Sequence, residues 1–291
     1  MIGRIMQGIG SFYTVESGEE SFVCKARGRF RKEHITPLIG DMVEFTPPEN
    51  DDNEGSIDMI LPRKNELLRP PLANIDLLFV ACASTSPEPD LLLIDRLLVR
   101  ARKAGIESAV VVNKTDLDPE MAENIAEQYR LSGYPVYLVC ANSGEGIGQL
   151  KDAAKGKIIA FAGQSAVGKS SMMNALCPGL NLETGDLSRI ERGRHTTRKA
   201  SLIKREDGYL ADTPGFSLLE LDTFDPETLK ECYPEFAPFE DGCRFLGCQH
   251  IGEPVCGVKE AAKQGKISPE RLERYGILHD ELKEKWGKRY D

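Results

Sequence analysis

Two short motifs stand in an unusual order along this chain, and their order limits the folds that it can adopt. The tetrapeptide Asn113–Asp116, Asn-Lys-Thr-Asp, precedes the glycine-rich segment Gly163–Ser170, which has the pattern Gly-x4-Gly-Lys-Ser. In the α/β domains that combine these motifs, the glycine-rich loop opens the domain and the tetrapeptide comes later. The reversed order predicts a circular permutation, in which the usual ends of the domain are joined and another loop is opened.

The length and composition favour several small domains and no membrane span. A chain of 291 residues exceeds one small core, so two or three domains are expected. No apolar run approaches the roughly 20 residues of a membrane span, and the first residues alternate like a strand rather than a signal peptide. We therefore expect a cytoplasmic protein. The net charge of -9 argues against indiscriminate binding of polyanions, although a local basic face can still contact RNA.

Three domains are predicted from changes in the sequence pattern. Residues 1–68 hold short alternating stretches between turn residues, which predicts a small β-barrel, with the OB-fold as one option. Residues 69–74 are typical of a stiff linker. Over 75–220 apolar runs alternate with helical patterns, which predicts a parallel sheet with helices on both faces. Residues 221–291 are rich in Pro, Cys and acidic side chains before two helical patterns, which predicts a mainly α-helical third domain.

The glycine-rich segment follows a strand pattern and opens a helical one, as a phosphate-binding loop does. Its backbone N–H groups would surround phosphate oxygens at a helix N-terminus. Lys169 would reach the β- and γ-phosphates, and the Ser170 hydroxyl would bind Mg²⁺. The predicted nucleotide contacts here are Gly163, Gln164, Ser165, Ala166, Val167, Gly168, Lys169, Ser170 and Ser171.

Other strand ends supply the remaining predicted nucleotide contacts, as expected where ligands bind at the carboxyl edge of an open α/β sheet. Asp116 can accept from the guanine N1–H and amino group, and adenine presents the opposite pattern, so this motif favours GTP over ATP. Asp212 would hold Mg²⁺, and the Gly215 N–H would sense the γ-phosphate. We also expect contacts from Asn113, which would tie neighbouring loops, from Lys114, whose stem would cover the base, and from Ala141, whose N–H would face guanine O6.

Three cysteines and a histidine cluster near the C-terminus with the spacing of one compact metal site. Cys243, Cys248, His250 and Cys256 would give Zn²⁺ four ligands, which leaves no position for water and makes the site structural. Free cysteines in a loop are the alternative. The other five cysteines are scattered, which suits reduced thiols better than a disulfide framework.

The order of motifs, the N-terminal barrel and the Cys/His cluster together resemble the RsgA family of circularly permuted GTPases over essentially the whole chain. The resemblance implies hydrolysis of GTP to GDP and phosphate, stimulated by the small (30S) ribosomal subunit late in its maturation, with binding to its rRNA. The alternative is a GTP-dependent binding switch that acts on a non-ribosomal protein partner. In either case we expect a monomer.

The residue that orients the attacking water is not the usual one. Many GTPases place a glutamine directly after Asp-x-x-Gly, but Phe216 stands there in this chain. The segment 192–197 resembles the family's switch I, so we expect His195 to orient the water. Either Thr196 or Thr197 would reach Mg²⁺, and we assign Thr197.

The best basic segment for RNA contact is 27–32, with the sequence Arg-Gly-Arg-Phe-Arg-Lys. Four positive charges surround Phe30, and one interpretation is that this ring stacks on a base. A solvated hairpin is the alternative interpretation.

Overall fold

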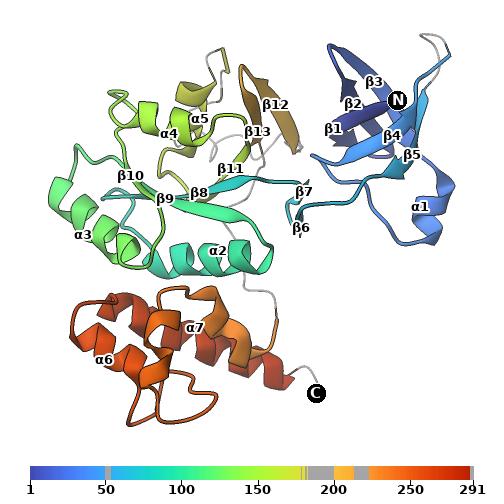
Figure 1. Cartoon of the computed structure of the whole chain (residues 1–291). Helices are drawn as coiled ribbons and strands as arrows, with labels where there is room; N and C mark the ends of the chain where they lie inside the picture. The colour runs from blue at the N-terminus through green and yellow to red at the C-terminus, as the bar shows by residue number, and fades with distance from the viewer. Residues whose placement is uncertain (50–53, 178, 181, 183–199, 213–222, 289–291) are drawn as a thin grey trace.

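The structure is a computed structural model, and it describes residues 1–49, 54–177, 179–180, 182, 200–212 and 223–288. These residues form an N-terminal β-barrel, a central α/β domain and a helical C-terminal domain, which confirms the predicted fold class (Figure 1). Of the predicted site residues, His195, Thr196, Thr197 and Gly215 lie outside the described residues. None of the described helices combines the length and the hydropathy that a bilayer span requires.

The N-terminal barrel is closed by five strands in the order β1-β2-β3-β5-β4, because β4 pairs back to β1. Only the β3–β5 pairing in this ring is parallel. Alternation along the strands points Ile5, Val15 and Phe45 into a shared core. The elements are β1 (Ile2–Ile9), β2 (Phe12–Ser17), β3 (Glu20–Ala26), α1 (Gly28–Lys32), β4 (Met42–Thr46) and β5 (Gly55–Ile60).

The basic segment 27–32 is where the structure contradicts the sequence-based interpretation. It contains the short helix α1 rather than a hairpin, and the helix places Phe30 in the barrel core with 4% of its surface exposed. The interpretation in which Phe30 stacks on an RNA base was therefore wrong. An aromatic residue among cations can fill the core as easily as it can project outward, and the sequence does not distinguish the two.

The central sheet has the strand order β10-β9-β8-β11-β13-β12. The first five strands are parallel, and β12 pairs antiparallel with β13 at the edge. All seven residues of β8 are buried, as expected for a central strand covered on both faces. The strands are β8 (Leu77–Ala83), β9 (Glu107–Asn113), β10 (Val136–Leu138), β11 (Ile158–Gly163), β12 (Ser201–Arg205) and β13 (Gly208–Asp212).

Helices cover both faces of this sheet (Figure 1). Helices α2 (Leu91–Lys103) and α3 (Pro119–Arg130) pack on one face, and α4 (Ile147–Ala153) and α5 (Lys169–Leu176) pack on the other. Asp90 accepts a hydrogen bond from the Leu93 N–H at 2.9 Å and so caps the start of α2. The carboxyl ends of the parallel strands thus share one edge that the helices leave open.

The predicted linker 69–74 contains the strand β7 (Pro71–Ala73). This strand pairs with β6 (Glu66–Leu68), at the end of the predicted barrel domain, in a two-stranded hairpin. A second connection is direct, since β1 pairs with the edge strand β12 through Gln7 and Ser201.

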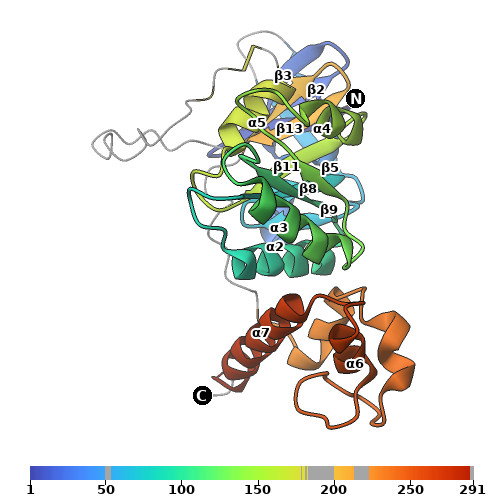
Figure 2. The ribbon, with the colours of Figure 1, turned by 90° about the vertical axis from the view of Figure 1, so that its left-hand side faces the viewer.

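The C-terminal domain packs against α2 of the central domain, and its helix α7 contacts α2 directly (Figures 1 and 2). Tyr233, Phe236 and Tyr275 form an aromatic cluster at its centre, with ring centroids 4.9–5.1 Å apart. The elements are the 3-10 helices η2 (Pro226–Cys232) and η3 (Ala237–Gly242), and the helices α6 (Gly257–Lys263) and α7 (Pro269–Gly287).

Candidate nucleotide site and metal centre

The phosphate loop joins β11 to α5 at the open edge of the sheet. Gly163 has a φ of +136° and lies so close to the Ala81 carbonyl that a Cβ would collide with it. Gly168 has a φ of +93° and lies against the Asn113 side chain, which likewise leaves no room for a Cβ. Both positions therefore require glycine. Ala166 also lies in the left-handed region, with a φ of +63°.

Lys169 is folded back over this loop. Its ammonium group donates to the carbonyl oxygens of Gly163 at 2.8 Å and Gln164 at 2.6 Å. Burial lowers the pKa of Lys169 to about 8, because the charged form loses hydration. The amine is therefore held at the mouth of the loop where phosphate oxygens would enter, and Ser170 and Ser171 follow it in the first turn of α5.

Asn113 joins the phosphate loop to the loop after β10. Its Nδ2 donates to the Val167 carbonyl at 2.8 Å, and its Oδ1 accepts from the Ala141 N–H at 3.0 Å. The Asn113 side chain is buried, so these bonds are shielded from water. The structure thus brings three predicted residues from separate loops into one connected frame.

The neighbouring residues of the tetrapeptide lie at the same edge. Lys114 has a φ of +61°, its carbonyl accepts from the Ser84 hydroxyl at 2.7 Å, and its Nζ donates to the Ser86 carbonyl. Asp116 is exposed, and Asp212 is half-buried at the last position of β13. Every described nucleotide residue of the prediction therefore lies at or just after a strand end on the open edge.

Gln164 has a second set of contacts that sequence reasoning missed. Its Oε1 accepts from the Asp90 N–H at 3.2 Å, and its Nε2 donates to the Glu88 carbonyl at 3.0 Å. The phosphate loop is thereby tied to the residues that begin α2. A glutamine inside a phosphate-loop pattern gives no sign of this, because its partners lie more than 70 residues earlier in the chain.

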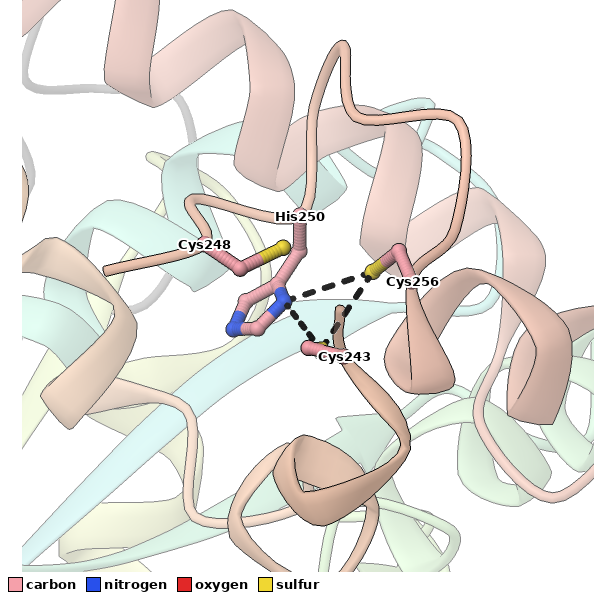
Figure 3. A group of neighbouring side chains, drawn as sticks. All are labelled: Cys243, Cys248, His250 and Cys256. Atoms are coloured by element: carbon pink, nitrogen blue, oxygen red, sulfur yellow. Dashed lines mark hydrogen bonds between the residues drawn. The ribbon is translucent and has the colours of Figure 1, made fainter. Parts of the chain in front are cut away.

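The four predicted metal ligands converge in the C-terminal domain (Figure 3). Their ligand atoms all lie within 4.8 Å of one another. Cys256 Sγ is 3.4 Å from His250 Nδ1 and 3.9 Å from Cys243 Sγ. Tetrahedral Zn²⁺ with bonds of about 2.3 Å to sulfur separates two thiolates by about 3.8 Å, so the donor set fits zinc.

Further contacts orient these ligands. The His250 Nε2 lies 3.2 Å from a carboxylate oxygen of Glu240, which leaves Nδ1 facing the thiols. The Gly257 and Lys259 N–H groups donate to Cys243 and Cys256 sulfur at 3.4 and 3.5 Å. Such outer contacts fix ring orientation and stabilise thiolates. The cluster is therefore a candidate metal site, and none of the eight cysteines forms a disulfide.

The strand order, the phosphate loop after β11 and the tetrapeptide after β9 define the class of protein as a circularly permuted P-loop GTPase. Comparison with family models agrees. The model of the RsgA GTPase matches residues 60–222, and that of the RsgA N-terminal domain matches residues 2–57.

Curated proteins and solved structures give the same result over nearly the whole chain. A protein of Alkaliphilus metalliredigens named small ribosomal subunit biogenesis GTPase RsgA is 43% identical, covering 97% of each chain. Its namesake in Geobacillus thermodenitrificans is 42% identical, covering 97% of this chain and 98% of the relative.

Two solved structures extend the likeness to three dimensions. YjeQ from Thermotoga maritima has a TM-score of 0.80 and 38% identity, covering 97% of this chain and 98% of its own. YloQ, described as a circularly permuted GTPase, has a TM-score of 0.80 and 35% identity, covering 98% of this chain and 95% of its own. The chain belongs to the RsgA GTPase family.

Proposed function

We propose that this protein hydrolyses GTP to GDP and phosphate as a factor in biogenesis of the small ribosomal subunit. The observation that carries the proposal is similarity over about 97% of the chain to proteins named for that role. The hydrogen bonds by which Asn113 joins the phosphate loop to the loop after β10 support it, because they hold the expected phosphate-binding and guanine-binding loops next to each other. Contact with rRNA through the barrel, action as a monomer and a cytoplasmic location complete the proposal.

Guanine recognition is assigned to the loops after β9 and β10. Asp116 would accept from the guanine N1–H and amino group, and the Lys114 stem would cover the base. Ala141 would donate to guanine O6, and for this its N–H must exchange its present bond to Asn113. The backbone from Gly163 to Ser171, with the Lys169 ammonium, would hold the phosphates.

The γ-phosphate side is assigned to three segments. Ser170, Asp212 and Thr197 would hold Mg²⁺, which when bound neutralises charge that develops on the phosphate oxygens. Thr196 and the Gly215 N–H would contact the nucleotide from the same side. His195 would orient the attacking water, because Phe216 has no polar group with which to do so.

The metal centre is assigned one structural Zn²⁺ per chain, held by Cys243, Cys248, His250 and Cys256. With four protein ligands it would offer no position to substrate, so its role is to hold the loop between η3 and α6 in place. We assign residues 1–68 to the barrel, 69–74 to the connection, 75–220 to the GTPase domain and 221–291 to the zinc domain.

The decisive experiment measures the GTP turnover rate with and without purified small ribosomal subunits. The proposal predicts a large stimulation by small subunits and none by an equal amount of large subunits. A rate that small subunits leave unchanged, together with GTP-dependent capture of a non-ribosomal protein, would favour the binding-switch alternative. Asp116→Asn should reduce the preference for GTP over xanthosine triphosphate, whose C2 carbonyl lacks the amino group that a carboxylate accepts from.

A further inference from the structure

A cavity of about 650 Å³ lies between the end of α5 and the β12–β13 hairpin. Leu176, Cys177, Leu180 and Ile203 give it apolar walls, and Lys151, Lys204 and Arg205 bring positive charge. Its volume is in the range of about 300–1,000 Å³ that small-molecule sites occupy.

This cavity does not belong to the nucleotide site. Helix α5 begins with Lys169 in the phosphate loop and ends at Leu176 beside the cavity, and an eight-residue helix is about 12 Å long. Strand β13 likewise begins next to the cavity at Gly208 and ends at the nucleotide edge with Asp212. The cavity therefore lies at the opposite edge of the sheet.

Arg205 is the unusual residue of this cavity. Its side chain is 5% exposed, and its Nη2 donates to Asp207 at 3.2 Å. Its Nε and Nη1 are buried and have no hydrogen-bond partner among the residues that the structure describes. Buried donors on a charged group are costly to leave unpaired, so an acceptor is expected against them.

The charged groups around these two donors are balanced, with three cations and three acids, so the choice of an anion rests on the unpaired guanidinium N–H groups and not on an excess of positive charge. Asp207 carries one negative charge near the guanidinium and is 36% exposed, so it balances Arg205 only in part. Lys204 is paired with Glu16 of the barrel at 3.0 Å, and Lys151 adds a further cation at the rim. The remaining acid of the lining, Glu206, is exposed.

We propose that this cavity binds a small anion, with a carboxylate or phosphate head on Arg205 and an apolar body against Leu176, Leu180 and Ile203. Charge-assisted hydrogen bonds to the guanidinium supply the affinity. The apolar walls select ligands that carry more than the anionic group alone. The site lies at the hairpin end of β12 and β13, and the nucleotide edge lies at the other end of these strands. Its occupant is therefore separate from the bound nucleotide.

The test uses the full chain saturated with Mg²⁺ and GDP, so that the phosphate loop is already filled. The melting temperature is followed while inorganic phosphate or hexanoate is added over the millimolar range. Both probes carry the head group and only hexanoate carries an apolar body, so a response to one alone identifies the source of the anion. Arg205→Gln should weaken binding of the effective probe by about tenfold or more. Lys204→Gln, which removes a cation already paired with Glu16, is the matched control and should change the affinity little.

Equal probe responses of wild type and Arg205→Gln, or no response of the wild type to either probe, would overturn the proposal. If Arg205→Gln does not fold, wild-type crystals with GDP bound can be soaked in selenate. An anomalous peak within hydrogen-bond distance of Arg205 Nε or Nη1 supports the site. Anomalous peaks at other places but none in this cavity would contradict the proposed site.

Discussion

Arg271 donates through Nη1 to the carboxylate of Asp95, and neither side chain has any exposed surface. Arg271 lies on α7 and Asp95 on α2, so this ion pair joins the C-terminal domain to the GTPase domain. Arg271 Nε also donates to Glu235 at 2.6 Å, and Arg274 Nε donates to the second oxygen of Asp95 at 2.5 Å. The interface is thus held by a buried charge network as well as by apolar packing.

Asp95→Ala should lower the free energy of unfolding by about 3–5 kcal/mol, because it leaves two guanidinium groups short of an acceptor at a dry interface. Urea denaturation followed by circular dichroism measures the loss. Glu123→Ala is the matched control, since it breaks an exposed pair with Arg130 and should cost less than about 1 kcal/mol. Equal losses in the two variants would show that the buried pair contributes no more than a surface pair.

Asn113→Ala should weaken GDP binding by about tenfold or more, because it removes the buried hydrogen bond to the Val167 carbonyl that holds the phosphate loop in place. Fluorescence titration with a labelled GDP measures the affinity. Asn142→Ala removes an exposed amide in the loop after β10 and should leave the affinity unchanged. An Asn113 variant with wild-type affinity would contradict the role of this hydrogen bond.

The central sheet was predictable because the apolar sequence pattern of its strands agrees with their buried position in the fold. The run Leu77–Ala83 is apolar throughout and buried throughout, and loops that follow parallel strands must meet at one edge. The Cys/His cluster was equally readable, since four strong metal donors within 14 residues have few other uses.

Contacts between distant segments were not predictable. Asp95 is a charged residue within the apolar pattern of a helix, and this was the only sequence feature that indicated a buried ion pair. Its partner, Arg271, lies 176 residues later in the chain. The interpretation of Phe30 was wrong because its charged neighbours indicate only the exposed side of α1. Phe30 lies on the other side of this helix, which packs into the barrel core.

Cys248→Ser should abolish stoichiometric zinc binding and destabilise the C-terminal domain, because the free energy of metal binding is also folding free energy. Metal analysis of purified protein should find about one zinc per wild-type chain and far less in the variant. Cys24→Ser changes a buried thiol in the barrel and should retain the metal. A wild-type protein purified without chelators that holds no zinc would reject the assignment.

His195→Ala should lower the rate of GTP turnover by about a hundredfold while GTP affinity stays nearly unchanged, because the residue is assigned to the attacking water and not to the bound nucleotide. Single-turnover hydrolysis in the presence of small ribosomal subunits measures the rate, and a nucleotide titration measures the affinity. His34→Ala, on the exposed surface of the barrel, is the control. An unchanged rate in the His195 variant would remove it from the catalytic assignment.

GDP affinity should fall as the pH rises above about 8, the value to which burial lowers the pKa of Lys169 in the free protein. Bound phosphates favour the ammonium form and raise this pKa, so affinity is greatest below pH 8 and weakens as binding begins to require uptake of a proton. A free-state pKa of about 8 makes binding about tenfold weaker at pH 9 than at pH 7, provided that the pKa in the complex lies well above 9.

Lys169→Arg separates this effect from titration of the nucleotide, because a guanidinium stays charged throughout this range. Both proteins share any pH dependence that comes from guanine or phosphate, so the prediction concerns only the excess slope of the wild type. Equal slopes would show that the Lys169 ammonium is already fully protonated at pH 9 before GDP arrives. In that case its bonds to the Gly163 and Gln164 carbonyls outweigh the loss of hydration.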